Sequence, residues 1–347
     1  MVGLNDYCPM HIEGDGDKVR IPCPIDPKHT IFEADLDKHV LICSKTKDVA
    51  FIKSQKLYHE NVNLTPGKVE NCSLQGFSVS AEVAEFWGKK IELALARLSK
   101  GVDYSTHFDV CEIEGDKHKL QNEQIVKAIL NLKVISSASD KFCVAEFGCG
   151  KGGLASCLMQ ESLAKTWKFL LIDREARRNK AENRNREIES VRLRLDLKDT
   201  DLSLINSDNV FSVDLTSMIV CAKHLCGSAT DLTLLAVKRS PVPVSLCIAT
   251  CCHHACDWNV FVGRELFTEI ALCSNAEEFM IIRLLSSWAT STDGTLSPEK
   301  IRIGRTAKHV IDLSRCLWIK SNLNDKVTYG PFIDVKISPE NYLILAD

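Results

Sequence analysis

The chain has 347 residues, 45% of them hydrophobic and 26% charged, and a formal net charge of −3. This length favours a large catalytic domain with an accessory module, and the composition excludes an intrinsically disordered chain. Because the net charge is small, nucleic-acid binding would have to depend on local basic patches. The sequence shows no basic N-terminal stretch followed by an apolar run, and no segment of about 20 apolar residues. We therefore expect an intracellular protein of the cytoplasm or nucleus, without signal peptide, transmembrane segment or membrane partner.

The first 50 residues are rich in Cys, His and Pro and show neither a helical nor a strand period, which favours organisation by a metal. Four residues follow the spacing Cys-x5-His-x9-His-x3-Cys and offer the ligands of a tetrahedral Zn²⁺ site: Cys23, His29, His39 and Cys43. A short helix over 31–43 would place His39 and Cys43 on one face. The chain's 16 cysteines fall in such spacing or on predicted strands, so we expect a reducing compartment rather than a disulfide framework.

Residues 61–76 have the composition of a linker, and Ser80 is the expected N-cap of a helix that runs to about Lys100 and stops at Gly101. The apolar face of this helix is expected to consist of Val83, Phe86, Trp87, Leu93, Ala94 and Leu98. Its basic side consists of Lys89, Lys90, Arg97 and Lys100. Such a side is typical of a solvated face, with contact to an RNA backbone as the alternative.

From Lys119 onward, helix-like and strand-like segments alternate, which indicates a parallel sheet covered by helices on both faces. The expected strands are residues 142–147, 169–173, 191–196, 218–222 and 245–250. Residues 332–337 and 342–346 flank Ser338-Pro339-Glu340 and predict a tight antiparallel hairpin. The predicted fold class is therefore α/β, a Rossmann-like class I methyltransferase sheet with a C-terminal antiparallel hairpin, preceded by a small zinc finger.

A glycine-rich turn follows the first of these strands, in the sequence Glu-Phe-Gly-Cys-Gly-Lys-Gly-Gly over 146–153. Glycines allow the backbone to approach a nucleotide-like cofactor closely, and NAD enzymes use a similar turn. Acidic residues at the ends of the next two strands favour S-adenosylmethionine, since they suit its ribose hydroxyls and adenine amino group. The expected cofactor-binding residues are Glu146, Gly148, Gly150, Lys151, Gly152, Asp173 and Asp196.

Two polar loops, 223–232 and 251–258, follow the fourth and fifth strands and should open at the same edge of the sheet. Methyl transfer to a weak nucleophile such as a ribose hydroxyl needs a group that removes its proton or stabilises the oxyanion. Lys223, His224 and Asp231 are the catalytic candidates, any of which suits the role of base. Cys251 to His254 are interpreted as packing or substrate contacts, with a second metal site as the less favoured alternative, because consecutive side chains diverge.

A basic run follows the second strand and consists of Arg174, Arg177, Arg178, Lys180, Arg184 and Arg186. These residues could hold tRNA phosphates. The alternative is a solvated helix with internal ion pairs, since Glu175, Glu182 and Glu187 are interspersed.

The motifs together resemble the eukaryotic tRNA 2′-O-methyltransferases that act on acceptor-stem nucleotide 4. The resemblance runs through the Cys-His-His-Cys finger, residues 121–130, the glycine loop, Lys-His-Leu-Cys-Gly over 223–227, Cys-Cys-His-His-x-Cys-Asp-Trp over 251–258, and 338–345. It implies S-adenosylmethionine-dependent 2′-O-methylation of nucleotide 4, with tRNA as the partner. It also implies a basic helix near the RNA over Gly304 to Trp318, with Arg302, Arg305, Lys308 and Arg315.

In this interpretation, residues 1–16 are the remnant of a CCCH finger, and whether Cys8 and His11 still bind a metal stays open, because the two upstream cysteines of that finger are missing. Residues 17–48 form the CHHC finger, 49–105 a linker and helical segment, and 106–347 the methyltransferase domain. Two alternatives stay open at this point. One is methylation of a base or another small acceptor, and the other is a non-catalytic RNA-binding or spliceosomal adaptor.

Overall fold

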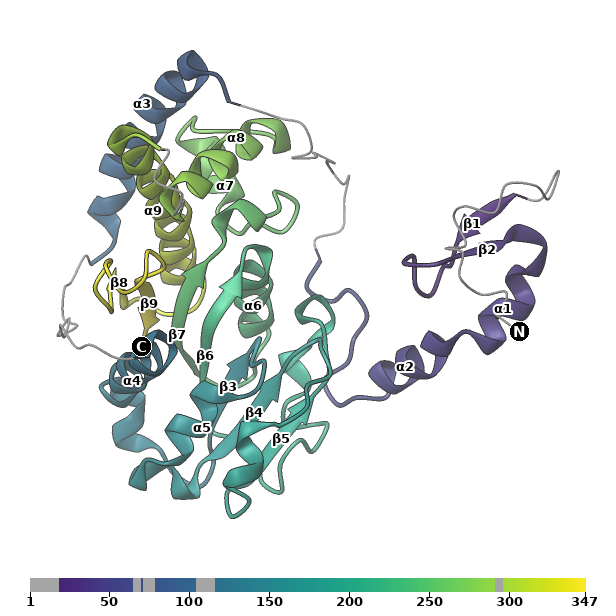
Figure 1. Ribbon diagram of the computed structural model, residues 1–347. Helices are drawn as coiled ribbons and strands as arrows, with labels where there is room; N and C mark the ends of the chain where they lie inside the picture. Colours follow the sequence, from purple (N-terminus) through teal and green to yellow (C-terminus); the bar gives the residue numbers. More distant parts are fainter. Residues whose placement is uncertain (1–18, 65–69, 71–78, 104–115, 291–295) are drawn as a thin grey trace.

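The computed structural model describes residues 19–64, 70, 79–103, 116–290 and 296–347, so that the fragment from Cys8 to His11 lies outside the described residues. A seven-stranded sheet with the order β5-β4-β3-β6-β7-β9-β8 forms the centre (Figure 1). Its parallel strands are β3 (Phe142–Phe147), β4 (Lys168–Ile172), β5 (Ser190–Leu193), β6 (Ser217–Cys226) and β7 (Val244–Cys251). The predicted fold class is confirmed.

Two antiparallel strands complete the sheet beside β7, namely β8 (Val327–Pro331) and β9 (Tyr342–Ala346). The predicted C-terminal antiparallel hairpin is confirmed, but its first strand is not residues 332–337, because β8 lies further toward the N-terminus and the connecting turn is therefore long. Residues 332–341 instead form a long compact turn, in which Asp334 O accepts hydrogen bonds from the amides of Ile337 and Ser338. Asp334 Oδ1 also accepts from the amide of Lys336 at 2.7 Å, so this segment satisfies its polar groups locally and does not pair as a strand.

Alternate side chains of the parallel strands enter cores on opposite faces of the sheet. On one face, Val144 and Leu171 pack with α4 (Lys117–Leu130) and α5 (Gly153–Met159). On the other face, Ala145 and Leu170 belong to the core of α3, α6, α8 and α9. The bounds on this face are α3 (Ala81–Leu98), α6 (Ser228–Lys238), α7 (Arg264–Glu269), α8 (Ala276–Ser287) and α9 (Pro298–Asn322).

Helix α3 begins as predicted, since the side chain of Ser80 accepts a hydrogen bond from the amide of Val83. Its buried face packs against α9 and consists of Ala84, Trp87, Gly88, Ile91, Ala94 and Leu98. Phe86 and Leu93, expected on that face, are exposed instead. The preceding segment also contacts the core, because Leu57 is fully buried and Tyr58 forms a bridge with Thr200.

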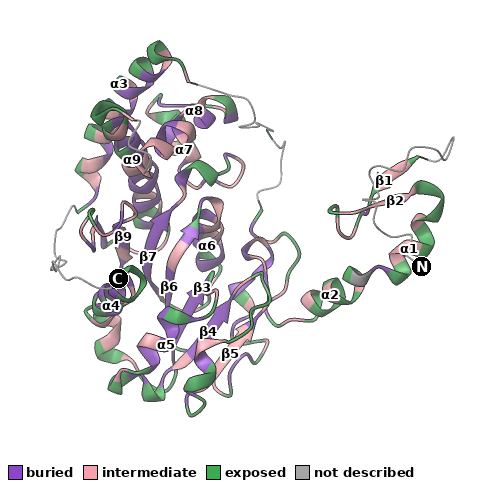
Figure 2. Cartoon of the chain, in the orientation of Figure 1, coloured by how far each residue is buried: buried purple, intermediate pink, exposed green. Residues whose placement is uncertain are grey.

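The N-terminal finger consists of β1 (Arg20–Pro22), β2 (Thr30–Phe32) and α1 (Leu36–Ile42), followed by α2 (Ser44–Lys53). The helix predicted over 31–43 is partly wrong, since β2 pairs with β1 and the α-helix begins only at Leu36. Figure 1 shows the finger apart from the sheet and joined to it through α2. Buried residues gather in the sheet and its helices, while the finger is mostly exposed or half-buried (Figure 2). A metal, rather than an apolar core, must therefore organise the finger.

Within the described part of the chain, no helix combines the length and the apolar composition that a membrane span requires.

Candidate functional site

The glycine loop lies between β3 and α5, at the carboxyl edge of the sheet. Gly148, Gly150 and Gly152 have φ angles of +62°, +51° and +78°, in the left-handed region that favours glycine. A Cβ added at Gly150 would meet nothing within 4 Å, which means that the loop has open space above it. The chain thus provides a glycine-lined cradle that is open at Gly150 and lies next to Asp173.

The three expected acidic residues surround this loop in different ways. Asp173, at the end of β4, accepts hydrogen bonds from the amides of Gly150 (2.7 Å) and Glu175 (2.8 Å). Asp196 accepts from the amide of Lys198 and caps a short 3-10 helix. Glu146 is buried and accepts from the amide of Ala155 at 2.8 Å. Burial raises the pKa of its carboxyl to about 7.

Arg192 on β5 and Glu182 in the turn before it hold the glycine loop in place. Neither was expected to be a site residue. Arg192 Nη1 donates to the carbonyl of Gly150 (3.0 Å), and Arg192 Nε donates to Glu182 Oε1 (2.6 Å). A Cβ at Gly152 would lie 2.8 Å from Glu182 Oε2 and 2.9 Å from Arg192 Nη2. The ion pair therefore fixes the shape of the cradle. The alternation of Val191 and Leu193 with Arg192 and Arg194 was the signal available.

Lys223 and His224 lie near the carboxyl end of β6, where the register with β7 shifts. Lys223 Nζ donates to the carbonyl of His118 (2.9 Å) and to Asn122 Oδ1 (2.7 Å). His224 has a φ angle of +60°, and its Nε2 lies 3.3 Å from Gln121 Oε1. The first turns of α4 therefore hold both side chains at this edge.

The environment of these two side chains favours their neutral forms. Burial lowers the pKa of the Lys223 ammonium. Burial, together with the charge of Lys223, lowers the pKa of the His224 imidazole. A partly desolvated lysine beside a neutral imidazole can accept a proton or donate a hydrogen bond to a developing oxyanion.

Asp231 does not lie with Lys223 and His224, and the expectation of a catalytic role for it is corrected here. Its carboxylate is fully buried and pairs with Arg315 Nη2 at 2.6 Å. Arg315 Nη1 also donates to Asp312 Oδ1 at 3.1 Å. Because this arginine is itself fully buried, the group is a structural ion network between α6 and α9 and does not face a substrate.

Helix α9 is likewise not the basic RNA-facing surface that its sequence suggested. Arg315 is buried, Lys308 pairs with Glu340, and Arg302 pairs with Glu92. Of the four basic residues expected there, only Arg305 is both exposed and without an ion pair to another described residue. The positive charge of this helix is therefore largely offset by acidic side chains of the same protein.

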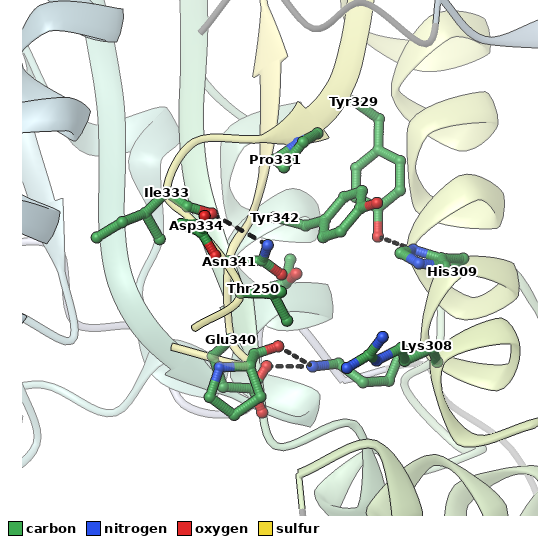
Figure 3. A pocket seen from close by; sticks show the side chains of 13 residues that line it. Thr250, Lys308, His309, Tyr329, Pro331, Ile333, Asp334, Glu340, Asn341 and Tyr342 are labelled. Carbon is green, nitrogen blue, oxygen red and sulfur yellow. Dashed lines mark hydrogen bonds and ion pairs between the residues drawn. The ribbon is translucent and has the colours of Figure 1, made fainter. Parts of the chain in front are cut away.

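A cavity of about 360 Å³ lies between α9 and the turn that joins β8 to β9 (Figure 3). Its aromatic lining includes His309, Tyr329 and Tyr342, and His309 Nδ1 lies 2.9 Å from the hydroxyl of Tyr329. Glu340 lines its opposite side and reaches the amide of Cys252, at the end of β7, with its Oε1 at 3.5 Å. The cavity therefore adjoins the edge that carries Lys223 and His224.

The four predicted zinc ligands come together in the finger. The two sulfurs, Cys23 Sγ and Cys43 Sγ, are 4.0 Å apart, and the Nε2 atoms of His29 and His39 are 3.0 Å apart. Zinc–sulfur bonds of 2.3 Å and zinc–nitrogen bonds of 2.0–2.1 Å predict tetrahedral edges of about 3.8 and about 3.3 Å. All four ligand atoms lie within 4.8 Å of one another, so the donor set and its size fit Zn²⁺.

The basic run after β4 is not an α-helix, which removes the alternative of internal helical ion pairs. It is a loop with one 3-10 turn (Ala181–Arg184). The interspersed acids pair elsewhere, Glu182 with Arg192 and Glu187 with Lys165. The exposed arginines of this loop are Arg174, Arg177, Arg178, Arg184 and Arg186. They form a local positive surface beside the cradle.

Two known families match this chain, one over the region of the large sheet and one over the finger. Residues 120–298 match the family described as Methyltransferase TRM13, and residues 20–44 match the U11-48K-like CHHC zinc finger. The chain is 26% identical to the "tRNA:m(4)X modification enzyme TRM13" of Vanderwaltozyma polyspora, over 98% of this chain and 92% of that protein. It is 29% identical to the Schizosaccharomyces pombe protein of the same name, over 86% and 87%.

The Homo sapiens homolog is 28% identical over 82% of this chain and 69% of that protein. Among solved structures, coclaurine N-methyltransferase in complex with N-methylheliamine and SAH covers 78% of this chain and 89% of its own, with 10% identity and a TM-score of 0.32.

Proposed function

Since the chain belongs to the Methyltransferase TRM13 family, we propose that it transfers a methyl group from S-adenosylmethionine to the 2′-hydroxyl of nucleotide 4 in the tRNA acceptor stem. Relatives that align with nearly the whole chain bear the name tRNA:m(4)X modification enzyme. The single observation that carries the proposal is that an open glycine cradle and a partly desolvated lysine share one edge of the sheet.

The residues that would hold the cofactor are Glu146, Gly148, Gly150, Lys151, Gly152, Asp173 and Asp196. When bound, S-adenosylmethionine supplies an electrophilic methyl group on a positively charged sulfonium. The ionised form of Glu146 would attract this positive charge, and the carboxylate of Asp173 would accept hydrogen bonds from the ribose hydroxyls. The space above Gly150, where a Cβ would meet nothing, supports this assignment.

Lys223 and His224 are the proposed catalytic residues. A ribose 2′-hydroxyl is a weak nucleophile, so its proton has to leave as the oxygen attacks. Lys223 Nζ, which Asn122 and the carbonyl of His118 hold at this edge, would take this proton or stabilise the oxygen. Neutral His224 is the alternative acceptor, since Gln121 orients its ring. A non-catalytic adaptor would need neither an open cradle nor a desolvated lysine beside it.

Two separate surfaces are available for tRNA. The exposed arginines between Arg174 and Arg186 would contact phosphates beside the cradle. The finger, with Zn²⁺ on Cys23, His29, His39 and Cys43, would provide a second contact at a distance from the sheet. We propose residues 17–48 as the finger and 106–347 as the methyltransferase domain, to which α3 adds its buried face. An intracellular site, the cytoplasm or the nucleus, follows from the tRNA substrate.

The test is incubation of the full chain with an unmodified tRNA transcript and methyl-labelled S-adenosylmethionine, followed by mapping of the labelled nucleotide. We expect label on the ribose of nucleotide 4. A matched transcript with a 2′-deoxyribose at that one position should accept no label. Label on a base, label that persists in the deoxy transcript, or no label with the folded zinc-loaded protein would reject the proposal.

A further inference from the structure

Three cysteine thiols come together at the carboxyl edge of the sheet, outside the finger. Cys226 ends β6, and its register partner Cys251 ends the adjacent strand β7. Their sulfurs are 3.4 Å apart. The sulfur of Cys252, the next residue along the chain, joins them, so that all three ligand atoms lie within 4.8 Å of one another.

The backbone explains how two consecutive cysteines reach the same point. Side chains of consecutive residues in an extended strand point to opposite faces, which is why the sequence alone disfavoured a metal here. Cys252 instead has a φ angle of +47°, in the left-handed region. This turn at the end of β7 brings its sulfur back beside that of Cys251. A Cβ added at the neighbouring Gly227 would lie 2.4 Å from the backbone of Ala255. The loop after β6 and the loop after β7 are therefore in close backbone contact.

Burial in a core accounts for Cys251, which is buried, but not for the other two cysteines of this cluster. Other cysteines of the same sheet, Cys143, Cys221 and Cys247, are fully buried and behave as small apolar side chains. Cys226 is exposed and Cys252 is half-buried. Thiols that converge at an exposed edge are available to a soft or borderline cation from solvent.

We propose that Cys226, Cys251 and Cys252 bind one Zn²⁺ ion as thiolates, in a second zinc site of this chain. Tetrahedral coordination with zinc–sulfur bonds of 2.3 Å predicts sulfur–sulfur distances of about 3.8 Å, close to the spacing of the cluster. Among the described residues, no His, Asp or Glu atom joins the group, so water completes the tetrahedron. Binding releases the three thiol protons to solvent.

The ion ties the end of β6 to the end of β7. Lys223 and His224 lie only a few residues before Cys226 on β6, in the irregular stretch where the register shifts. The metal would therefore hold in place the end of β6, which carries these two side chains. The site would remain if the chain methylated a different acceptor, because it depends only on the three thiols and their backbone.

The test is the zinc content of the purified full chain, measured by elemental mass spectrometry after dialysis against metal-free buffer. We expect Cys226→Ser and Cys252→Ser each to lose one zinc per chain relative to the wild type. Cys157→Ser, a half-buried cysteine on α5, is the matched control and should lose none. Cys43→Ser should lose the zinc of the finger, and the double variant Cys43→Ser with Cys226→Ser should lose two.

Cobalt provides a second readout that does not depend on methyl transfer. The full chain with the finger disabled by Cys23→Ser and Cys43→Ser should still take up one Co²⁺, with the intense thiolate-to-cobalt absorption of a tetrahedral site. Adding Cys226→Ser should abolish this absorption. Unchanged zinc in both Cys226→Ser and Cys252→Ser, or a Cys226–Cys251 disulfide without zinc in the purified protein, would overturn the proposal.

Discussion

Glu146 should make the protein without cofactor less stable as the pH rises toward neutrality. The side chain is only 4% exposed, and burial raises the pKa of its carboxyl from the ordinary 4.5 to about 7. At about 1.4 kcal/mol per pKa unit, this difference corresponds to about 3 kcal/mol of unfolding free energy. Because the fold prefers the neutral carboxyl, its contribution to stability is fully present below pH 4.5 and is lost as the pH rises through about 7.

Glu146→Gln replaces this carboxyl by a neutral group that can still accept the hydrogen bond from Ala155. The free energy of unfolding in urea should then be higher than that of the wild type by about 3 kcal/mol at about pH 8, and nearly equal at about pH 4. Glu277→Gln removes an exposed carboxylate on α8 and should leave the wild-type pH dependence in place. If the free energies of unfolding of the wild type and Glu146→Gln changed in parallel with pH, the reasoning would be refuted.

The same carboxyl should couple cofactor binding to proton release. A bound sulfonium or amino group favours the ionised carboxylate, so its pKa falls and a proton leaves at a pH near 7. Calorimetric titrations in two buffers with different ionisation enthalpies count these protons. We expect about half a proton per bound cofactor at about pH 7 in the wild type, and none in Glu146→Gln. Equal proton counts in the two proteins would show that Glu146 does not meet the cation.

Three further perturbations test other parts of the site. Lys223→Ala should slow single-turnover methyl transfer by about 10²- to 10⁴-fold and leave cofactor affinity, measured by calorimetry, nearly unchanged; full activity would remove Lys223 from the mechanism. Gly150→Ala should lower the free energy of unfolding by only about 1–2 kcal/mol, because alanine is strained at the left-handed φ of this position. It should also weaken cofactor binding, and unchanged affinity would show that the glycine cradle does not hold the cofactor. Arg315→Met should destabilise the fold by about 3–5 kcal/mol in urea, because it leaves buried carboxylates unpaired, and the exposed control Arg305→Met should have little effect.

The features that the sequence predicted correctly are local ones. Continuous apolar runs identify β3 and β4, because parallel strands covered on both faces have no polar side. Ser80 identifies the start of α3, because an N-cap depends on a side chain and an amide three residues apart. The spacing of the finger ligands has the same local character, and their atoms lie together.

The features that sequence reasoning missed depend on contacts between distant segments. Arg315 has the composition of an RNA-binding residue, but its partner Asp231 lies 84 positions away along the chain. Cys251 and Cys252 would diverge in an ordinary strand, and only the left-handed turn at Cys252 brings them together. No local pattern marks either arrangement. Residues 332–337 are a different case, because their apolar pattern suits a strand while local hydrogen bonds to Asp334 form a turn.

The buried network of Asp231 and Arg315 has a structural role beside the edge that carries Lys223 and His224. Arg315 Nη2 donates to the carbonyl of Gly227 at 3.2 Å and so holds the loop after β6. Asp312, one turn earlier, lies 2.8 Å from His253 Nε2 and accepts from Thr250 Oγ1 at 2.7 Å, which holds the end of β7. One helix thus fixes both loops from the interior, while the proposed zinc ion joins them at the surface. Since Lys223 and His224 lie directly before the residues that both anchors hold, Cys226 and Gly227, loss of either anchor should impair the orientation of Lys223 before it impairs cofactor binding.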